Sequence, residues 1–336
     1  MFTRCIAERL RSLEPGKMQT RGSLAILPLF GASDPQPEYE LLRSDADAKV
    51  LVRESSAHGS VPELVVENRS GRRVLILAGE HLLGAKQNRV VNTDLLIPAR
   101  SKRKIPVTCV EQGRWHSTSE SMRAGPMTPP SIRALNAEAV SRNAYARRCF
   151  DSDQGAVWGA VGKVLCGMAI RSPSSALSDA YRERAEELDE VREEMHVPAG
   201  AVGVAVFYGS DLIAVDIFDK AATLGRFWDR LMDGYSMDWL ARRAAERAKR
   251  RVRGEPGGKE KEDAALEPLD AIEEVGEALE HTQWAAYPSP GEGYDCRMSA
   301  RRHTATALVW EERIVVHAQV FPLAKRRRRE EEFAVV

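Results

Sequence analysis

Short apolar runs separated by turn residues fill the first third of the chain, and they predict β-strands. We predict strands at residues 24–30, 39–42, 50–54, 88–97 and 105–111, the last two as a pair. Two further aliphatic runs, residues 63–67 and 74–77, flank the turn Asn68-Arg-Ser-Gly71, which is the pattern of a β-hairpin. Residues 20–116 are therefore predicted to be mostly β.

After Pro130 the apolar positions recur every three or four residues, which is the period of α-helices. We predict helices at residues 131–148, with Ser131 as the N-cap, and at residues 154–168, 174–195 and 266–281. A further helix carries the clearest apolar stripe in the chain, at Leu224, Phe227, Trp228, Leu231, Met232 and Tyr235. Because side chains three and four positions apart share one helix face, we expect this stripe to lie in the core rather than around a ligand.

Two hairpins are predicted in the second half of the chain. One joins residues 201–207 to 212–218, and the other joins 305–310 to 314–321. Strands first, helices in the middle and strands last predict an α+β fold, with a mostly antiparallel β-sheet core and a helical middle section packed on it. The last hairpin is expected to join the first sheet.

The same pattern gives the expected domain organisation. We predict one α+β domain at residues 20–323, after an N-terminal extension at residues 1–19 and before a disordered charged tail at residues 324–336. The domain is divided into a β-rich part (20–116), a helical part (130–195), a hairpin with a helix (200–252), a charged linker (253–265) and C-terminal strands (283–323). The linker is rich in Gly and charged residues, which gives it little apolar surface to bury.

Charge narrows the range of partners. The chain has 336 residues, 43% of them hydrophobic, and its 49 basic and 49 acidic residues give a net charge of zero. Bulk charge therefore gives no reason to expect nucleic acid or an anionic membrane as a partner. Residues 242–253 are strongly basic, and residues 325–329 are basic before an acidic run. We expect the tail to be solvated, and nucleic-acid binding through these basic segments is the weaker alternative.

The cysteines and the N-terminus indicate the compartment. The chain has five cysteines, an odd number, and they form neither a C-x-x-C pair nor a His/Cys zinc pattern. The first ten residues are charged where a signal peptide is apolar, and no apolar run approaches 18 residues. We therefore expect free thiols in a cytoplasmic protein with no membrane association. No metal centre is predicted, and the residues do not identify a cofactor.

Charged and amide side chains gather between residues 79 and 115, in segments that otherwise resemble buried strands. A buried carboxylate or guanidinium is costly unless it is paired, so this concentration is the leading candidate for a site. On the strand 105–111, alternation places Glu111 on the apolar face with Val107 and Cys109. Glu111 is then either a general base, a role for which Glu80 is the other candidate, or one half of a structural ion pair with Arg89 or Arg114.

The neighbouring side chains suggest a ligand. The candidates are Lys86, Arg89 and Arg114 for phosphate, Gln87, Asn88 and Asn92 for sugar or base, and Trp115 for stacking. The glycines beside Lys86 are not those of a P-loop, because Ala85 and Gln87 flank Lys86 where that loop has Gly and Ser or Thr. The alternative for Asn88 and Asn92 is that they bind the ends of neighbouring strands.

Several stretches together resemble a known family. They are Val61–Asn68, Gly79-Glu80, Gly84–Arg89, Asn92, Pro106–Trp115, the hairpin at 200–218 and Val316-His317. Over roughly residues 20 to 323 the chain is similar to the prokaryotic "ARG and rhodanese-phosphatase-superfamily-associated protein" domain. The family name refers to genes that occur beside ADP-ribosylglycohydrolases. The resemblance therefore implies, by association, a role near ADP-ribose or NAD-derived nucleotides.

Two hypotheses follow for the polar residues. In the first, they form a site for a small phosphorylated ligand such as ADP-ribose, in an enzyme or a sensor. In the second, they form an internal network in a non-catalytic module whose charged helices bind a protein partner. The hypotheses differ in one spatial respect: Glu80, Gln87, Arg89, Glu111 and Arg114 either line one open cleft or close on one another in the interior.

Overall fold

The structure is a computed structural model that describes residues 1–43, 49–56, 59–253, 276 and 282–323. These residues form six helices and 18 strands in mostly antiparallel sheets, which confirms the predicted α+β fold. None of the described helices combines the length and the apolar character that crossing a membrane requires.

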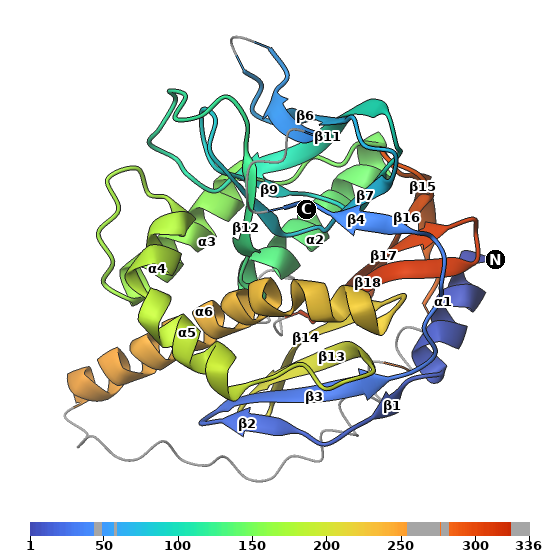
Figure 1. Cartoon of the computed structure of the whole chain (residues 1–336). Helices are drawn as coiled ribbons and strands as arrows, with labels where there is room; N and C mark the ends of the chain where they lie inside the picture. Colours follow the sequence, from blue (N-terminus) through green and yellow to red (C-terminus); the bar gives the residue numbers. More distant parts are fainter. Residues whose placement is uncertain (44–48, 57–58, 254–275, 277–281, 324–336) are drawn as a thin grey trace, which may run out of the picture.

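The largest sheet has nine strands and forms one side of the molecule (Figure 1). Its strands are β1 (Glu14–Pro15), β2 (Gln19–Arg21), β3 (Leu24–Phe30), β13 (Ala201–Tyr208), β14 (Asp211–Phe218), β15 (Ala285–Pro288), β16 (Tyr294–Ser299), β17 (His303–Trp310) and β18 (Ile314–Pro322). They follow the order β1-β3-β13-β14-β18-β17-β16-β15, with β2 paired to β3. Both predicted hairpins are present, and the last one joins the sheet of the first long strand through the β14–β18 pairing.

Two smaller sheets hold the other strands of the first third. They are built from β4 (Tyr39–Leu41), β5 (Val50–Glu54), β6 (Glu63–Asn68), β7 (Arg73–Ile76), β8 (Glu80–Leu83), β9 (Arg89–Val91), β10 (Leu95–Ile97), β11 (Ser101–Cys109) and β12 (Arg123–Met127). One sheet has the order β12-β8-β9-β11-β6-β5, and the other has the order β10-β7-β4. β4 is parallel to β7, whereas the other pairs in these sheets are antiparallel.

The predicted hairpin of residues 63–67 and 74–77 is wrong, because β6 pairs with β5 and β11 whereas β7 pairs with β4 and β10. The side chain of Asn68 explains the separation. Its Nδ2 donates to the carbonyls of Arg72 (2.8 Å) and Pro98 (2.9 Å). These bonds fix the connection from β6 in one sheet to β7 in the other, in place of a tight hairpin turn.

The predicted strand 88–97 is divided in two, and only its first part, β9, pairs with β11. The interruption falls at Asn92, Thr93 and Asp94, whose side chains are all buried. Each of these side chains hydrogen-bonds a group outside β9. These bonds fix the segment in which the chain passes from the six-stranded to the three-stranded sheet.

The helices are α1 (Phe2–Arg11), α2 (Pro130–Arg147), α3 (Gln154–Gly167), α4 (Leu177–Glu183), α5 (Ala185–Glu194) and α6 (Ala221–Arg253). The predicted single helix at 174–195 is therefore two helices. Ser131 is not the N-cap of α2, since the cap position is Pro129 and lacks a side-chain hydrogen bond. Instead the Ser131 amide and hydroxyl donate to the carboxylate of Asp238 on α6, at 3.0 and 2.7 Å. Apart from Gly276, the predicted helix 266–281 lies outside the described residues, as do most of the linker and the tail.

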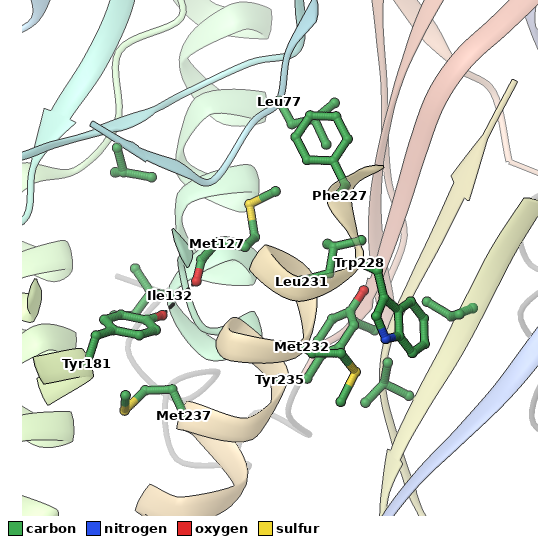
Figure 2. Close-up of a cluster of buried hydrophobic side chains, with 14 of the residues drawn as sticks. Leu77, Met127, Ile132, Tyr181, Phe227, Trp228, Leu231, Met232, Tyr235 and Met237 are labelled. Atoms are coloured by element: carbon green, nitrogen blue, oxygen red, sulfur yellow. Dashed lines mark hydrogen bonds between the residues drawn. The ribbon is translucent and has the colours of Figure 1, made fainter. Parts of the chain in front are cut away.

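α6 lies in the middle of the fold, between β12 of the six-stranded sheet and β13 of the nine-stranded sheet (Figure 1). Its predicted apolar stripe is buried, as expected, and packs with Leu77, Met127 and Ile132 (Figure 2). Burying a large apolar side chain contributes about 1.5–3 kcal/mol. This stripe therefore joins the two sheets and fixes the position of the strands that carry the polar motif.

Residues 1–19, predicted as an N-terminal extension, contain α1 and β1. Ile6 of α1 is buried and packs with Leu27 of β3 and Val215 of β14 in a second apolar cluster. α1 thus covers the face of the nine-stranded sheet that α6 leaves free.

Candidate functional site

The polar motif lies where β8, β9 and β11 of the six-stranded sheet end. The β8–β9 turn contains Gly84 and Ala85, both with positive φ angles (119° and 45°). A Cβ on Gly84 would overlap the hydroxyl oxygen of Ser119, so only glycine allows this approach. The turn and the loop after β11 are then held together by a 3.0 Å hydrogen bond from the Ala85 amide to Ser119 Oγ.

Glu111 and Arg114 form a bidentate ion pair. Arg114 Nε donates to Glu111 Oε1 at 2.9 Å, and Arg114 Nη2 donates to Oε2 at 2.7 Å. The Ser174 hydroxyl (2.8 Å) and the backbone N–H of Asn88 (3.0 Å) donate to the same carboxylate. Burial alone would raise the pKa of Glu111, but these donors lower it below its ordinary value. The contacts are those of the structural ion pair, and Glu111 holds Arg114 in place.

The ion pair lines one of two neighbouring hollows in this region. The Arg114 hollow has a volume of about 760 Å³ and is lined by residues that include Asn88, Glu111, Arg114, Thr118, Ser119, Ser178 and Arg182. The Glu54 hollow has a volume of about 560 Å³ and is lined by Arg53, Glu54, Ser56, Ala85, Lys86 and residues 117–120. Thr118 and Ser119 line both, so the hollows are adjacent.

The carboxylate of Glu54, which lines the Glu54 hollow, and the guanidinium of Arg89, which is buried beside it, are incompletely hydrogen-bonded. Glu54 Oε1 accepts from the Lys86 amide at 3.2 Å, whereas the buried Oε2 has no partner among the described residues. Arg89 is fully buried, and its Nη1 donates to Gln87 Oε1 at 3.0 Å. Among the described residues, the Nε and Nη2 atoms of Arg89 have no hydrogen-bond partner. The nearest Glu54 oxygen lies 3.9 Å from Nη2, which is too far for a hydrogen bond. Buried polar groups are normally satisfied, so this pair needs an explanation.

Trp115 lies beside the same pair. Its ring is 5.6 Å from Lys86 Nζ and 5.6 Å from the Arg89 guanidinium carbon, within the range of cation–π contacts. Trp115 is nevertheless 46% exposed, which is high for an aromatic side chain in a folded domain. An indole between two cations and solvent can stack on a planar ligand.

The other predicted residues lie away from both hollows. Glu80 is completely buried and accepts from Arg230 Nη1 (2.6 Å) and the Leu77 amide (3.0 Å). Burial raises the pKa of Glu80 to about 7 despite the Arg230 charge. Asn92 is also buried: it donates to the Phe150 carbonyl at 2.9 Å and accepts from the Thr108 hydroxyl at 2.7 Å.

The predicted residues therefore do not share a single hollow. Asn88, Glu111 and Arg114 line one hollow, Lys86 lines the other, and Gln87, Arg89 and Trp115 are connected to the second through their contacts. Glu80 and Asn92 belong to the interior.

A second polar cluster, fully buried, connects the sheets. His317 on β18 bridges two carboxylates, with Nδ1 2.8 Å from Asp94 and Nε2 3.2 Å from Asp216. Arg133 of α2 binds Asp216 through both Nη atoms, and the Tyr235 hydroxyl donates to Asp216 at 2.6 Å. Burial would lower the pKa of His317, but the two carboxylates raise it to about 9. We call these five residues the His317 network.

Arg53, Glu54, Thr118 and Ser119 were not predicted as site residues. A signal existed for Glu54, because alternation places it on the same strand face as the buried Val52, and the same reasoning identified Glu111. Thr118 and Ser119 are small polar residues in an irregular loop, and their positions depend on the tertiary fold.

Comparison with known proteins identifies the family. No curated protein and no solved structure matches the chain. The model of the ARG and Rhodanese-Phosphatase-superfamily-associated Protein domain matches residues 12–321, which is most of the chain and confirms the resemblance. The chain therefore belongs to the ARG and Rhodanese-Phosphatase-superfamily-associated Protein domain family.

Proposed function

We propose that this protein binds a small phosphorylated ligand of the ADP-ribose or NAD-derived class in the Glu54 hollow, as a sensor rather than as an enzyme. The observation that carries the proposal is the incompletely satisfied pair, Glu54 Oε2 with Arg89 Nε and Nη2. A ligand hydroxyl in the hollow supplies the donor that Glu54 Oε2 lacks.

The residues at the hollow fit such a ligand group by group. Glu54 Oε2 can accept a hydrogen bond from a ribose hydroxyl, and Lys86 brings positive charge for a phosphate. Arg53 also lines the hollow, but its guanidinium is paired with Glu120 at 3.0 Å. The exposed indole of Trp115 offers a stacking surface for a base. A volume of about 560 Å³ is within the usual range for small-molecule sites.

Binding without catalysis agrees with the state of the two candidate bases. Glu111 is fully hydrogen-bonded and its pKa is lowered, which makes it a weak proton acceptor. Glu80 has a pKa near 7, but it is sealed in the interior and paired with Arg230. The family name adds the association with ADP-ribosylglycohydrolases.

Isothermal titration calorimetry of the purified protein with ADP-ribose, NAD and AMP tests the proposal. We expect ADP-ribose to bind, and Glu54→Gln to weaken it about tenfold or more, because a hydrogen bond to a charged group is worth about 1.5–3 kcal/mol. Lys86→Ala should weaken the binding of phosphate-containing ligands by a similar factor. The matched control is Lys163→Ala, an exposed lysine on α3 that lines neither hollow. Absence of binding heat with all three compounds would contradict the proposal.

A further inference from the structure

α6 is longer than the fold requires. Its last buried residue is Leu240, although the helix continues to Arg253. The thirteen residues 241–253, which we call the α6 arm, span about 20 Å at 1.5 Å per residue. Figure 1 shows this end of α6 projecting beyond the body of the molecule. Ala241 and Ala244 still pack against the core, so core packing explains α6 up to Ala244 but not the rest of the arm.

The charge of the arm is strongly one-sided. Its cations are Arg242, Arg243, Arg247, Lys249, Arg250, Arg251 and Arg253, and its one acidic residue is Glu246. Cations four positions apart, such as Arg247 and Arg251, destabilise an isolated helix. Among the described residues, Arg247, Arg250 and Arg251 have no ion pair. The helix dipole favours cations in the last turn, but it does not explain those that begin three turns earlier.

The apolar residues of the arm restrict the kind of partner. They are Ala241, Ala244, Ala245, Ala248 and Val252, and Val252 is 89% exposed. Helices that insert into a membrane surface use large apolar side chains such as Trp, Phe and Leu. Helices that bind a protein groove also need large anchors at this spacing. Alanine and one valine provide neither, so the charges must supply most of the recognition.

We propose that the α6 arm binds the phosphate backbone of duplex DNA, independently of base sequence. Six of the seven cations are arginines, whose planar guanidinium matches phosphate oxygens in a bidentate geometry. A helix is about 10–12 Å across, and the major groove of B-DNA is about 12 Å wide. Binding phosphates also relieves the repulsion between the arm's own cations. The zero net charge of the whole chain conceals this local concentration.

Fluorescence anisotropy of a labelled 20-base-pair duplex with the full chain, from 50 to 200 mM salt, tests the proposal. We expect the association constant to fall steeply with salt, since each neutralised phosphate contributes about 0.9 to the log–log slope. Arg247→Gln, Arg250→Gln and Arg251→Gln together should reduce that slope by about 2 to 3. The control is Arg4→Gln, Arg103→Gln and Lys163→Gln together, which removes equal charge from exposed sites outside the arm.

The outcomes separate clearly. A steep slope that the arm variant reduces and the control does not supports the proposal. Absence of binding at 50 mM salt overturns it, as does an equal effect of the two triple variants. Tenfold tighter binding to duplex RNA, to polyglutamate or to phosphatidylserine vesicles than to the DNA also overturns it, because the arm then serves another polyanion. Circular dichroism of each variant checks that α6 stays folded.

Discussion

The His317 network and the Glu54 hollow both place charged side chains among buried strands, yet they are built differently. In the network, Asp216 accepts from Arg133, Tyr235 and His317, and Asp94 accepts from the other ring nitrogen of His317. At the hollow, Glu54 has one unused oxygen and Arg89 has two unused nitrogens among the described residues. Among the described residues the network leaves one buried atom, Arg133 Nε, without a hydrogen-bond partner, whereas the pair at the hollow leaves three.

The difference indicates how to separate structural from functional polar residues in this fold. A buried charge with all its partners contributes to a unique arrangement of the sheets and has nothing left for a ligand. A buried charge with unused hydrogen-bonding atoms beside a hollow lowers stability unless something binds there. By this measure Glu111 belongs with the His317 network, although it lines a hollow.

Breaking the His317 network should have the largest effect. Asp216→Asn removes the charge that compensates Arg133 in a fully buried position. Leaving one member of a buried ion pair uncompensated costs about 3–5 kcal/mol, so the free energy of unfolding should fall by that amount. Urea denaturation followed by circular dichroism measures it.

The control for Asp216→Asn is Glu63→Gln, which removes one partner of the exposed Lys104–Glu63 pair. Because exposed pairs contribute less than about 1 kcal/mol, this variant should unfold almost like the wild type. A loss below 1 kcal/mol for Asp216→Asn itself would mean that the network is not a principal connection between the sheets.

The second prediction concerns pH. The folded pKa of His317 is about 9, above its ordinary value of about 6.5. Because the folded state holds this proton more tightly, the stabilisation is complete below pH 6.5 and is lost as the pH rises through 9. The unfolding free energy should therefore decrease by roughly 3 kcal/mol over that window, as measured by denaturation at intervals of half a pH unit.

His317→Gln separates this effect from other groups that titrate in the alkaline range, such as Cys109, whose pKa burial raises to about 11. The variant should be less stable than the wild type at pH 6, and its stability should depend less on pH between 6.5 and 9. An unchanged pH dependence would assign the effect to other residues.

The sequence was sufficient to predict elements with a regular period. The α6 stripe and the hairpin of β13 and β14 could be predicted because apolar side chains recur in them at regular positions, and these side chains are buried in the structure. The pairing of β6 and β7 was mispredicted, because the side chain of Asn68 competes with the turn for backbone carbonyls. Local sequence shows that an asparagine is present but does not show which carbonyls it will reach.

The candidate site shows the same limit. Alternation along a strand correctly located Glu111 near Arg114, two residues that are close in the sequence. It did not show that Glu80 would meet Arg230, 150 positions away, or that His317 would lie between Asp94 and Asp216. Sequence patterns thus identified several of the buried polar residues, but their partners come from distant segments. The partners decide whether a residue is structural or available to a ligand.

The smallest predicted effects are those of replacing the two acidic residues that line the hollows, Glu111 and Glu54. Glu111→Gln should lower the unfolding free energy by about 2 kcal/mol, because the carboxylate loses its charged bonds to Arg114. Glu54→Gln should lower it by about 1 kcal/mol or less, since the Lys86 amide bond can persist and Arg89 is 3.9 Å away. Thermal melting and ligand titration of both variants separate the roles. Glu111→Gln should mainly change stability, and Glu54→Gln should mainly change affinity. The reverse result would place the ligand in the Arg114 hollow and make Glu111, rather than Glu54, the residue that contacts it.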